Sequence, residues 1–87
     1  MSWKVVFTKQ AQKDAKRISS AGLKDKAENI IHQLRLNPFS NNPPFEKLKG
    51  DLTGAYSRRI NIQHRIVYQI YEEEKIIKVI RMWTHYE

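Results

Sequence analysis

The sequence has no cysteine, so neither a disulfide nor a cysteine-ligated zinc site can hold the fold together. It also lacks the run of roughly 20 apolar residues that a membrane-spanning helix needs, and its first residues lack a signal-peptide core. It contains no glycine-rich phosphate loop, no HExxH motif and no carboxylate cluster suited to a metal. We therefore expect a cytoplasmic protein that uses no metal and no cofactor and does not contact a membrane.

Positive charge, in contrast, is abundant: 16 Lys and Arg against 9 Asp and Glu give a formal net charge of +7. Such an excess favours an anionic partner, above all a nucleic acid, although a well-solvated basic surface is the alternative. The 87 residues are enough for one domain, 1–87. Because a domain of this size without covalent staples is marginally stable alone, a protein partner or a homodimer is expected.

The hydrophobic pattern predicts a β-α-α-β-β-β order. Residues 3–7 form a short strand, residues 9–19 form a helix capped by Thr8, and residues 23–36 form a second helix after a stop at Gly22. Residues 37–54 are expected to be irregular, and strands follow at 56–62, 64–71 and 75–83, the last one internal. The predicted fold class is α+β, with two helices on one face of a twisted, mainly antiparallel, four-stranded sheet.

Alternation along the predicted strands separates two faces. Tyr56, Ile60 and Ile62 lie on one side of the first strand of the series, and Ser57, Arg59 and Asn61 lie on the other. In the next strand, Ile66, Tyr68 and Ile70 face the core and Arg65, Val67 and Gln69 face away. A sheet face that receives two arginines, Arg59 and Arg65, and that no helix covers is a candidate anion site.

The residues that could act chemically are of three kinds: a carboxylate, several cations and an imidazole beside a phenol. RNA cleavage without a metal needs a base for the 2′-hydroxyl, cations for the phosphorane and an acid for the leaving 5′-oxygen. An imidazole, with an unperturbed pKa of about 6.5, can serve as acid or base near neutral pH. The candidates are Glu46, Lys47, Lys49, Arg58, Arg59, Arg65, His85 and Tyr86.

Each candidate also has a purely structural interpretation, which composition and spacing leave open. Glu46 can be a surface ion-pair partner, the arginines can be solvated strand residues, and His85 with Tyr86 can serve packing. His32, within the second helix, and His64, beside a turn, are interpreted as structural.

The segment FEKLKGDLTGAYSRRINIQHRIVY, followed later by HY, resembles the YoeB/Txe toxins of the RelE-like superfamily. The similarity runs in order through a glutamate, a Ser-Arg-Arg-Ile stretch, a His-Arg-hydrophobic-Val-Tyr stretch and the final His-Tyr pair. Members of that family are mRNA endoribonucleases that act in the ribosomal A site and are neutralised by a co-expressed antitoxin.

The resemblance implies a role for each matching residue. Glu46 is the expected general base and His85 the expected general acid. Arg65 is expected to stabilise the phosphorane, and Tyr86 to orient the phosphate or stack on a base. Further phosphate contacts are expected from Lys49, Arg58 and Arg59.

The resemblance also implies partners. These are a neutralising YefM/Axe-like antitoxin, the ribosomal A site with its mRNA, a second copy of the chain in a homodimer and, for the toxin–antitoxin complex, its own promoter DNA. Two other functions stay open at this point. Some relatives with the same fold poison DNA gyrase by binding, and a basic domain can bind nucleic acid without any catalysis.

Overall fold

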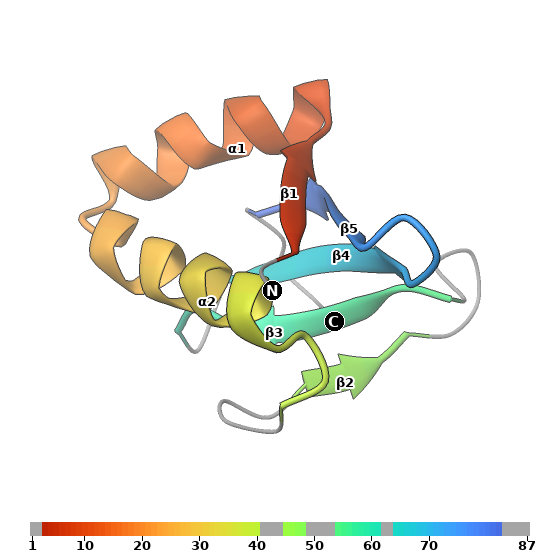
Figure 1. Cartoon of the computed structure of the whole chain (residues 1–87). Helices are drawn as coiled ribbons and strands as arrows, with labels where there is room; N and C mark the ends of the chain where they lie inside the picture. The colour runs from red at the N-terminus through yellow and green to blue at the C-terminus, as the bar shows by residue number, and fades with distance from the viewer. Residues whose placement is uncertain (1–2, 41–44, 49–53, 62–63, 83–87) are drawn as a thin grey trace.

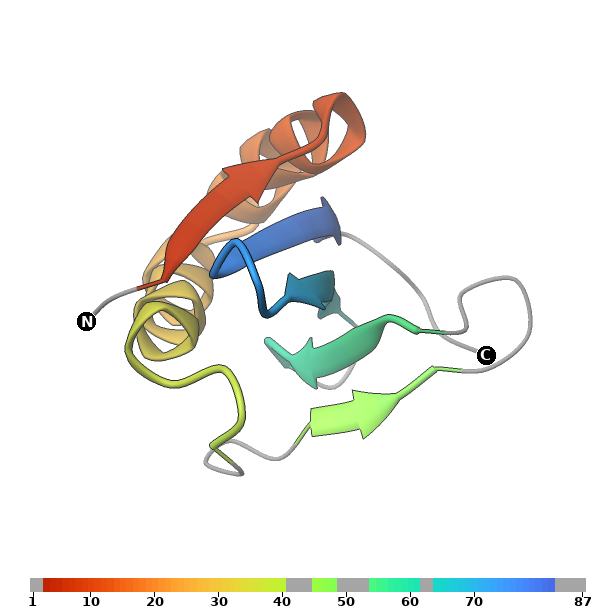
Figure 2. The same cartoon turned by 45° about the vertical axis from the view of Figure 1, so that its right-hand side comes forward.

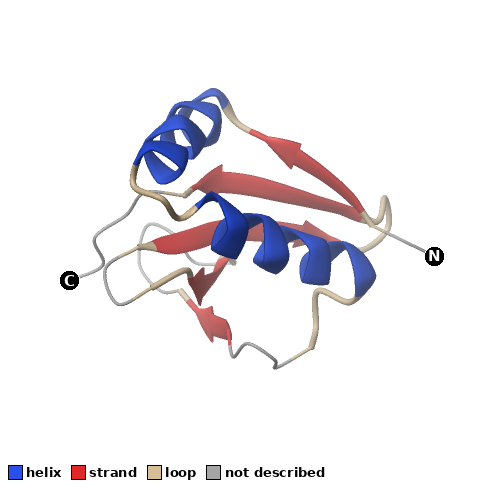
Figure 3. Ribbon diagram, turned by 90° about the vertical axis from the view of Figure 1, so that its left-hand side faces the viewer, coloured by secondary structure: helices blue, strands red, loops and turns tan. Residues whose placement is uncertain are grey.

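A computed structural model describes residues 3–40, 45–48, 54–61 and 64–82, in which two helices cover one face of a five-stranded sheet (Figure 1, Figure 3). The α+β class and the placement of both helices on one face are therefore as predicted. In chain order, the elements are β1 (Lys4–Phe7), α1 (Lys9–Ser20), α2 (Lys24–Leu36), β2 (Phe45–Lys47), β3 (Tyr56–Arg59), β4 (Arg65–Tyr71) and β5 (Ile76–Arg81).

The strand order across the sheet is β1-β5-β4-β3-β2, which can be followed in Figure 2. The pairs β2–β3, β3–β4 and β4–β5 are antiparallel, and β1 runs parallel to β5. The predicted mainly antiparallel character is confirmed. So is the internal position of the last strand, because β5 lies between β1 and β4.

The prediction of four strands is wrong, because β2 is a fifth. It comprises only Phe45, Glu46 and Lys47, inside the segment that we expected to be irregular. Three residues are too few for a period of two to be visible in a sequence. The strand forms because it pairs with β3, with Phe45 opposite Arg58 and Glu46 opposite Ser57.

Local signals fix both ends of α1 as predicted. The Thr8 hydroxyl accepts a hydrogen bond from the Ala11 N–H at 3.0 Å, which satisfies one of the unpaired donors at a helix N-terminus. At the other end Gly22 has φ +75°, a left-handed conformation that glycine adopts without strain. The N–H of Leu23 bonds the Ile18 carbonyl at 3.0 Å, which completes a Schellman motif.

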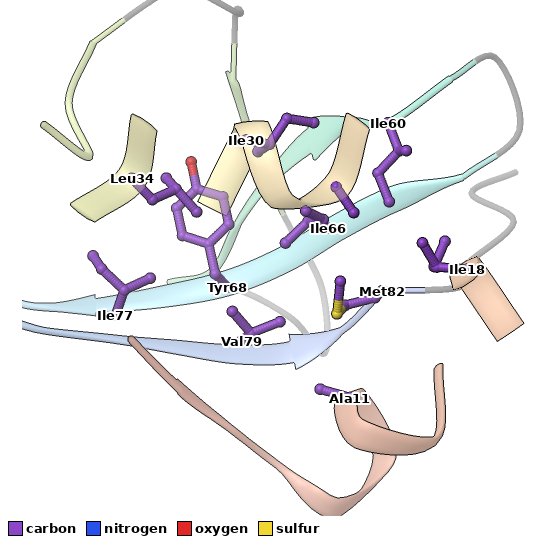
Figure 4. Close-up of a cluster of buried hydrophobic side chains, with 11 residues drawn as sticks. Ala11, Ile18, Ile30, Leu34, Ile60, Ile66, Tyr68, Ile77, Val79 and Met82 are labelled. Carbon is purple, nitrogen blue, oxygen red and sulfur yellow. The ribbon is translucent and has the colours of Figure 1, made fainter. Parts of the chain in front are cut away.

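The main core lies between the helices and the sheet. Ile30 and Leu34 of α2 lie over Ile66 and Tyr68 of β4 (Figure 4). The other buried members come from both helices, the strands and the strand ends: Ala11, Ile18, Ala27, Ile60, Ile77, Val79 and Met82. The opposite face of the sheet, called the open face below, carries a smaller apolar cluster of Leu48, Ala55 and Val67 with Ile80 packed against it. No helix within the described ranges is long and apolar enough to cross a membrane.

Candidate active site

The open face brings together two of the predicted residues from different strands. Arg65, at the start of β4, donates a hydrogen bond from Nη1 to Glu46 Oε2 on β2 at 3.1 Å. The Glu46 side chain is 58% exposed and the Arg65 side chain 14%. The carboxylate is therefore accessible to a bound substrate, while most of the Arg65 side chain is buried. This is the geometry expected of a base beside an anion-binding cation.

Arg59 lies next to this ion pair. It is exposed and directly opposite Arg65 in the β3–β4 register, so both arginines project from the open face as predicted. Two guanidinium groups opposite one another repel each other. Among the described residues, Glu46 is the carboxylate that contacts Arg65, and Arg59 adds a second positive charge beside this ion pair. That charge suits a phosphate.

Ser57 lies beside the ion pair, directly opposite Glu46. It sits on β3 in the same row as Glu46 and Val67, and it is 2% exposed. Adjacent strands are about 4.8 Å apart, so Arg65 on β4 must extend across the whole of β3 to reach Glu46 on β2. A small side chain at position 57 leaves room for that crossing. Sequence reasoning missed this role, although the alternation did place Ser57 on the open face.

Arg58, which we expected to contact phosphate, is instead buried on the other face of the sheet. It is 1% exposed and lies opposite Ile66 and Phe45 on the face that the helices cover. Its Nε donates to the Tyr68 hydroxyl at 2.9 Å, and its Nη2 donates to the carbonyls of Pro38 and Ser40 at 2.9 and 2.7 Å. Alternation explains the correction, because the neighbour of an outward-facing Arg59 must face inward.

Burial raises the pKa of the Tyr68 hydroxyl above its usual value of 10.0, and the hydrogen bond from Arg58 opposes that rise only in part. The hydroxyl is therefore a neutral acceptor for the buried guanidinium.

The last described part of β5 is held by α1. The Thr8 hydroxyl donates to the Ile80 carbonyl at 2.8 Å, and Asp14, which is buried, accepts from the Met82 N–H at 3.2 Å. Asp14 also accepts from Gln10 Nε2 at 2.9 Å. Sequence reasoning missed Asp14. The signal was its position, three residues after Ala11 and four before Ile18, on the apolar stripe of the helix.

Three predicted site residues, Lys49, His85 and Tyr86, lie outside the described residues, so their roles stay predictions. His32 is exposed on α2. His64 is buried at the turn before β4, and its backbone N–H donates to Asn61 Oδ1 at 2.7 Å. This placement agrees with a structural role. Among the described residues, no group of three or more His, Asp or Glu side chains is placed to hold a metal ion.

Comparisons with known proteins show the family to which the chain is similar. The family model described as the YoeB-like toxin of bacterial type II toxin–antitoxin systems matches residues 6–86. Toxin YoeB of Mycobacterium bovis is 35% identical over 57 residues, which cover 66% of this chain and 65% of that protein. The aligned part thus spans just under two thirds of that relative's length.

Solved structures extend the similarity over nearly the whole chain. A YoeB/ParE toxin from Agrobacterium tumefaciens superimposes with a TM-score of 0.85 at 32% identity and covers 95% of this chain and 99% of its own. YoeB of Staphylococcus aureus, solved in a heterotetrameric complex with YefM, gives 0.80 at 31% identity and covers 99% and 100%. The same protein has been solved as a dimer, with a TM-score of 0.82.

Proposed function

We propose, starting from the fact that the chain belongs to the YoeB-like toxins of bacterial type II toxin–antitoxin systems, that it is an mRNA endoribonuclease that acts on the ribosome without a metal ion. The observation that carries this proposal is the ion pair between Glu46 and Arg65 on the open face, with Arg59 beside it. An accessible carboxylate that is paired with the guanidinium of a mostly buried arginine side chain is suited to act on a hydroxyl next to a phosphate.

The proposed reaction is an internal transfer at the phosphate. Glu46 takes the proton of the 2′-hydroxyl, and the 2′-oxygen attacks phosphorus to form a pentavalent phosphorane. Arg65 and Arg59 stabilise its negative charge. The bond from phosphorus to the 5′-oxygen then breaks, and His85 gives that oxygen a proton. The products are a 2′,3′-cyclic phosphate and a 5′-hydroxyl, so protons and charge balance.

Other residues are proposed to hold the substrate. Lys49 adds a phosphate contact, and Tyr86 orients the scissile phosphate or stacks on a base. Exposed cations on α1 are candidates for contacts with ribosomal RNA, since the acidic residue of this helix, Asp14, is turned into the protein. These cations are Lys9, Lys13, Lys16 and Arg17.

The partners follow from the same premise and are also proposals. We propose neutralisation by a YefM-like antitoxin, and the complex of the S. aureus relative with YefM supports this. Homodimer formation is supported by the dimer of that relative. We further propose that the toxin–antitoxin complex binds its own promoter, and that the toxin acts in the cytoplasm, where translating ribosomes are.

The proposal is tested with Glu46→Ala and His85→Ala variants, separately and together. Each is expected to relieve growth arrest and to lower cleavage of mRNA on translating ribosomes by about 10²–10⁴-fold, the usual contribution of a positioned acid or base. Circular dichroism and binding to the antitoxin serve as controls for folding. If both variants stayed fully toxic, the mechanism would be wrong. Inhibition of DNA supercoiling by the purified protein would instead indicate a gyrase poison.

A further inference from the structure

We propose that Arg58 is a positioning residue that holds strand β2, and therefore Glu46, in place against Arg65. The inference rests on the proposed function of Glu46 as the base. Arg58 would act from the helix-covered face of the sheet, on the side away from the substrate.

Arg58 connects three separate parts of the chain at one point. Its guanidinium bonds the Tyr68 hydroxyl of β4 at 2.9 Å and the carbonyls of Pro38 and Ser40, at 2.9 and 2.7 Å, in the segment after α2. It also lies 5.5 Å from the centroid of the Phe45 ring on β2, within the range of a cation–π interaction. The planar fork of an arginine can satisfy all these partners at once, which neither lysine nor glutamine can.

Phe45 transmits this arrangement to the active site. Its ring lies against Arg58 and, in an edge contact at 5.5 Å between centroids, against Tyr56, which in turn stacks on Tyr68. Successive side chains of a strand point to opposite faces, so a Phe45 held on the helix-covered face directs Glu46 to the open face.

Strand β2 needs such an anchor. It has only three residues, lies at the edge of the sheet and pairs with β3 alone among the described strands. Short edge strands have few backbone hydrogen bonds to hold them, so side-chain packing decides their position. A displacement of about 1 Å at a catalytic group can lower the rate by about 10²-fold. Arg58 therefore affects catalysis without contacting the substrate.

The neighbouring arginines provide a matched test, because Arg58→Gln and Arg59→Gln each remove one positive charge from β3. For Arg58→Gln we expect faster hydrogen exchange at residues 45–48, including the Leu48 N–H that donates to Ala55, with exchange in β4 and β5 unchanged. We expect kcat on ribosome-bound mRNA to fall by up to about 10²-fold with KM unchanged. The salt dependence of binding to a short RNA should stay as in the wild type.

Arg59→Gln should behave in the opposite way. Exchange in β2 stays unchanged, and the slope of log K against log salt becomes shallower by about 0.7, the value for one phosphate contact with single-stranded RNA. The proposal is overturned if Arg58→Gln produces this shallower slope and leaves exchange at residues 45–48 unchanged.

A second variant covers the case in which Arg58→Gln does not fold. Phe45→Leu keeps Arg58 and its hydrogen bonds but removes the ring, and it should also speed exchange in β2 and lower kcat without a change in salt dependence. Unchanged exchange and full activity in Phe45→Leu would contradict the proposal. Hydrogen exchange is measured without RNA, so it decides the role of Arg58 even if Glu46→Ala were to retain activity and the proposed function were to fail.

Discussion

The two faces of the sheet use the same residue type in opposite ways. On the helix-covered face, Arg58 is 1% exposed and surrounded by Tyr68, Phe45 and two backbone carbonyls. On the open face the next residue, Arg59, is exposed beside Arg65 and Glu46. A buried guanidinium is tolerated only when its donors are hydrogen-bonded. Arg58 meets this condition, and its bonds hold β3, β4 and the segment after α2 together. The exposed Arg59, by contrast, remains able to receive an anion.

The packed core and the proposed catalytic residues therefore lie on opposite faces of one layer of backbone. The helix-covered face supplies the packed core that fixes the strands. The open face, held from behind, has a small apolar cluster and the charged residues. Variants in the main core should therefore change chiefly the free energy of unfolding, and variants on the open face should change chiefly activity. Arg58 and Phe45, which we propose hold Glu46 in place, are the exception on the helix-covered face.

The largest effect on stability is expected from the helix-covered face. Leu34→Ala removes a fully buried side chain between α2 and the sheet, and it should lower the free energy of unfolding by about 2–5 kcal/mol. Urea denaturation measures this change. The fraction that stays folded should cleave mRNA at the wild-type rate. A specific loss of activity in well-folded Leu34→Ala would break the separation of the two faces.

The largest effect on activity, apart from loss of the base or acid, is expected from Arg65→Gln on the open face. Removal of a cation that stabilises transition-state charge typically lowers kcat by about 10²–10³-fold. The ion pair with the exposed Glu46 should contribute less than about 1 kcal/mol to stability. Single-turnover cleavage and urea denaturation, made on the same preparation, separate the two quantities. A variant that was unstable but fully active per folded molecule would reverse the assignment of this face.

Alkaline pH should lower the free energy of unfolding through Tyr68, on the helix-covered face. Because the pKa of Tyr68 is raised in the folded protein, the folded state holds this proton more tightly than the unfolded state. The resulting stability is complete below the unfolded pKa of about 10 and is lost as pH rises through the folded pKa. The free energy of unfolding should fall by at most about 1.4 kcal/mol per pH unit in that range. In Tyr68→Phe this contribution to the pH dependence should be absent; an identical slope in both proteins would refute it.

The smallest expected effect is an increase in the free energy of unfolding. Arg59 and Arg65 are like charges directly opposite one another, an arrangement that destabilises a sheet by about 0.2–1 kcal/mol. Arg59→Gln should therefore raise the free energy of unfolding by up to that amount while RNA binding weakens. Lys78→Gln, which removes a charge from an exposed position on β5, is the control. Equal stabilisation by both variants would show that total charge, rather than this pair, is responsible.

Much of the fold could be predicted because its signals are local. Thr8, Gly22 and the apolar stripes place both helices, and alternation places Arg59 and Arg65 together. Strand β2 could not be predicted, because three residues carry no period and the strand exists only through its pairing with β3. Because β2 carries Glu46, the contact between Glu46 and Arg65 could not be predicted from the sequence pattern either.

The sequence did contain signals for the burial of Arg58 and of Asp14. Alternation that sends Arg59 outward sends Arg58 inward, yet the family resemblance and the charge placed both in the phosphate site. Asp14 lies on the apolar stripe of α1, where a carboxylate needs a partner. That partner, the Met82 N–H, is 68 residues away in sequence, which no local pattern reveals.

The measurement that tests the account most directly is single-turnover cleavage of mRNA on ribosomes by Glu46→Gln, with Lys47→Gln as the control. Both residues are exposed on β2 and neighbours in sequence, but they project from opposite faces of the sheet. We expect Glu46→Gln to lose about 10²–10⁴-fold in rate and Lys47→Gln to cleave within a few-fold of the wild type. A wild-type rate for Glu46→Gln, with the fold intact, would contradict the assignment of the open face as the active site.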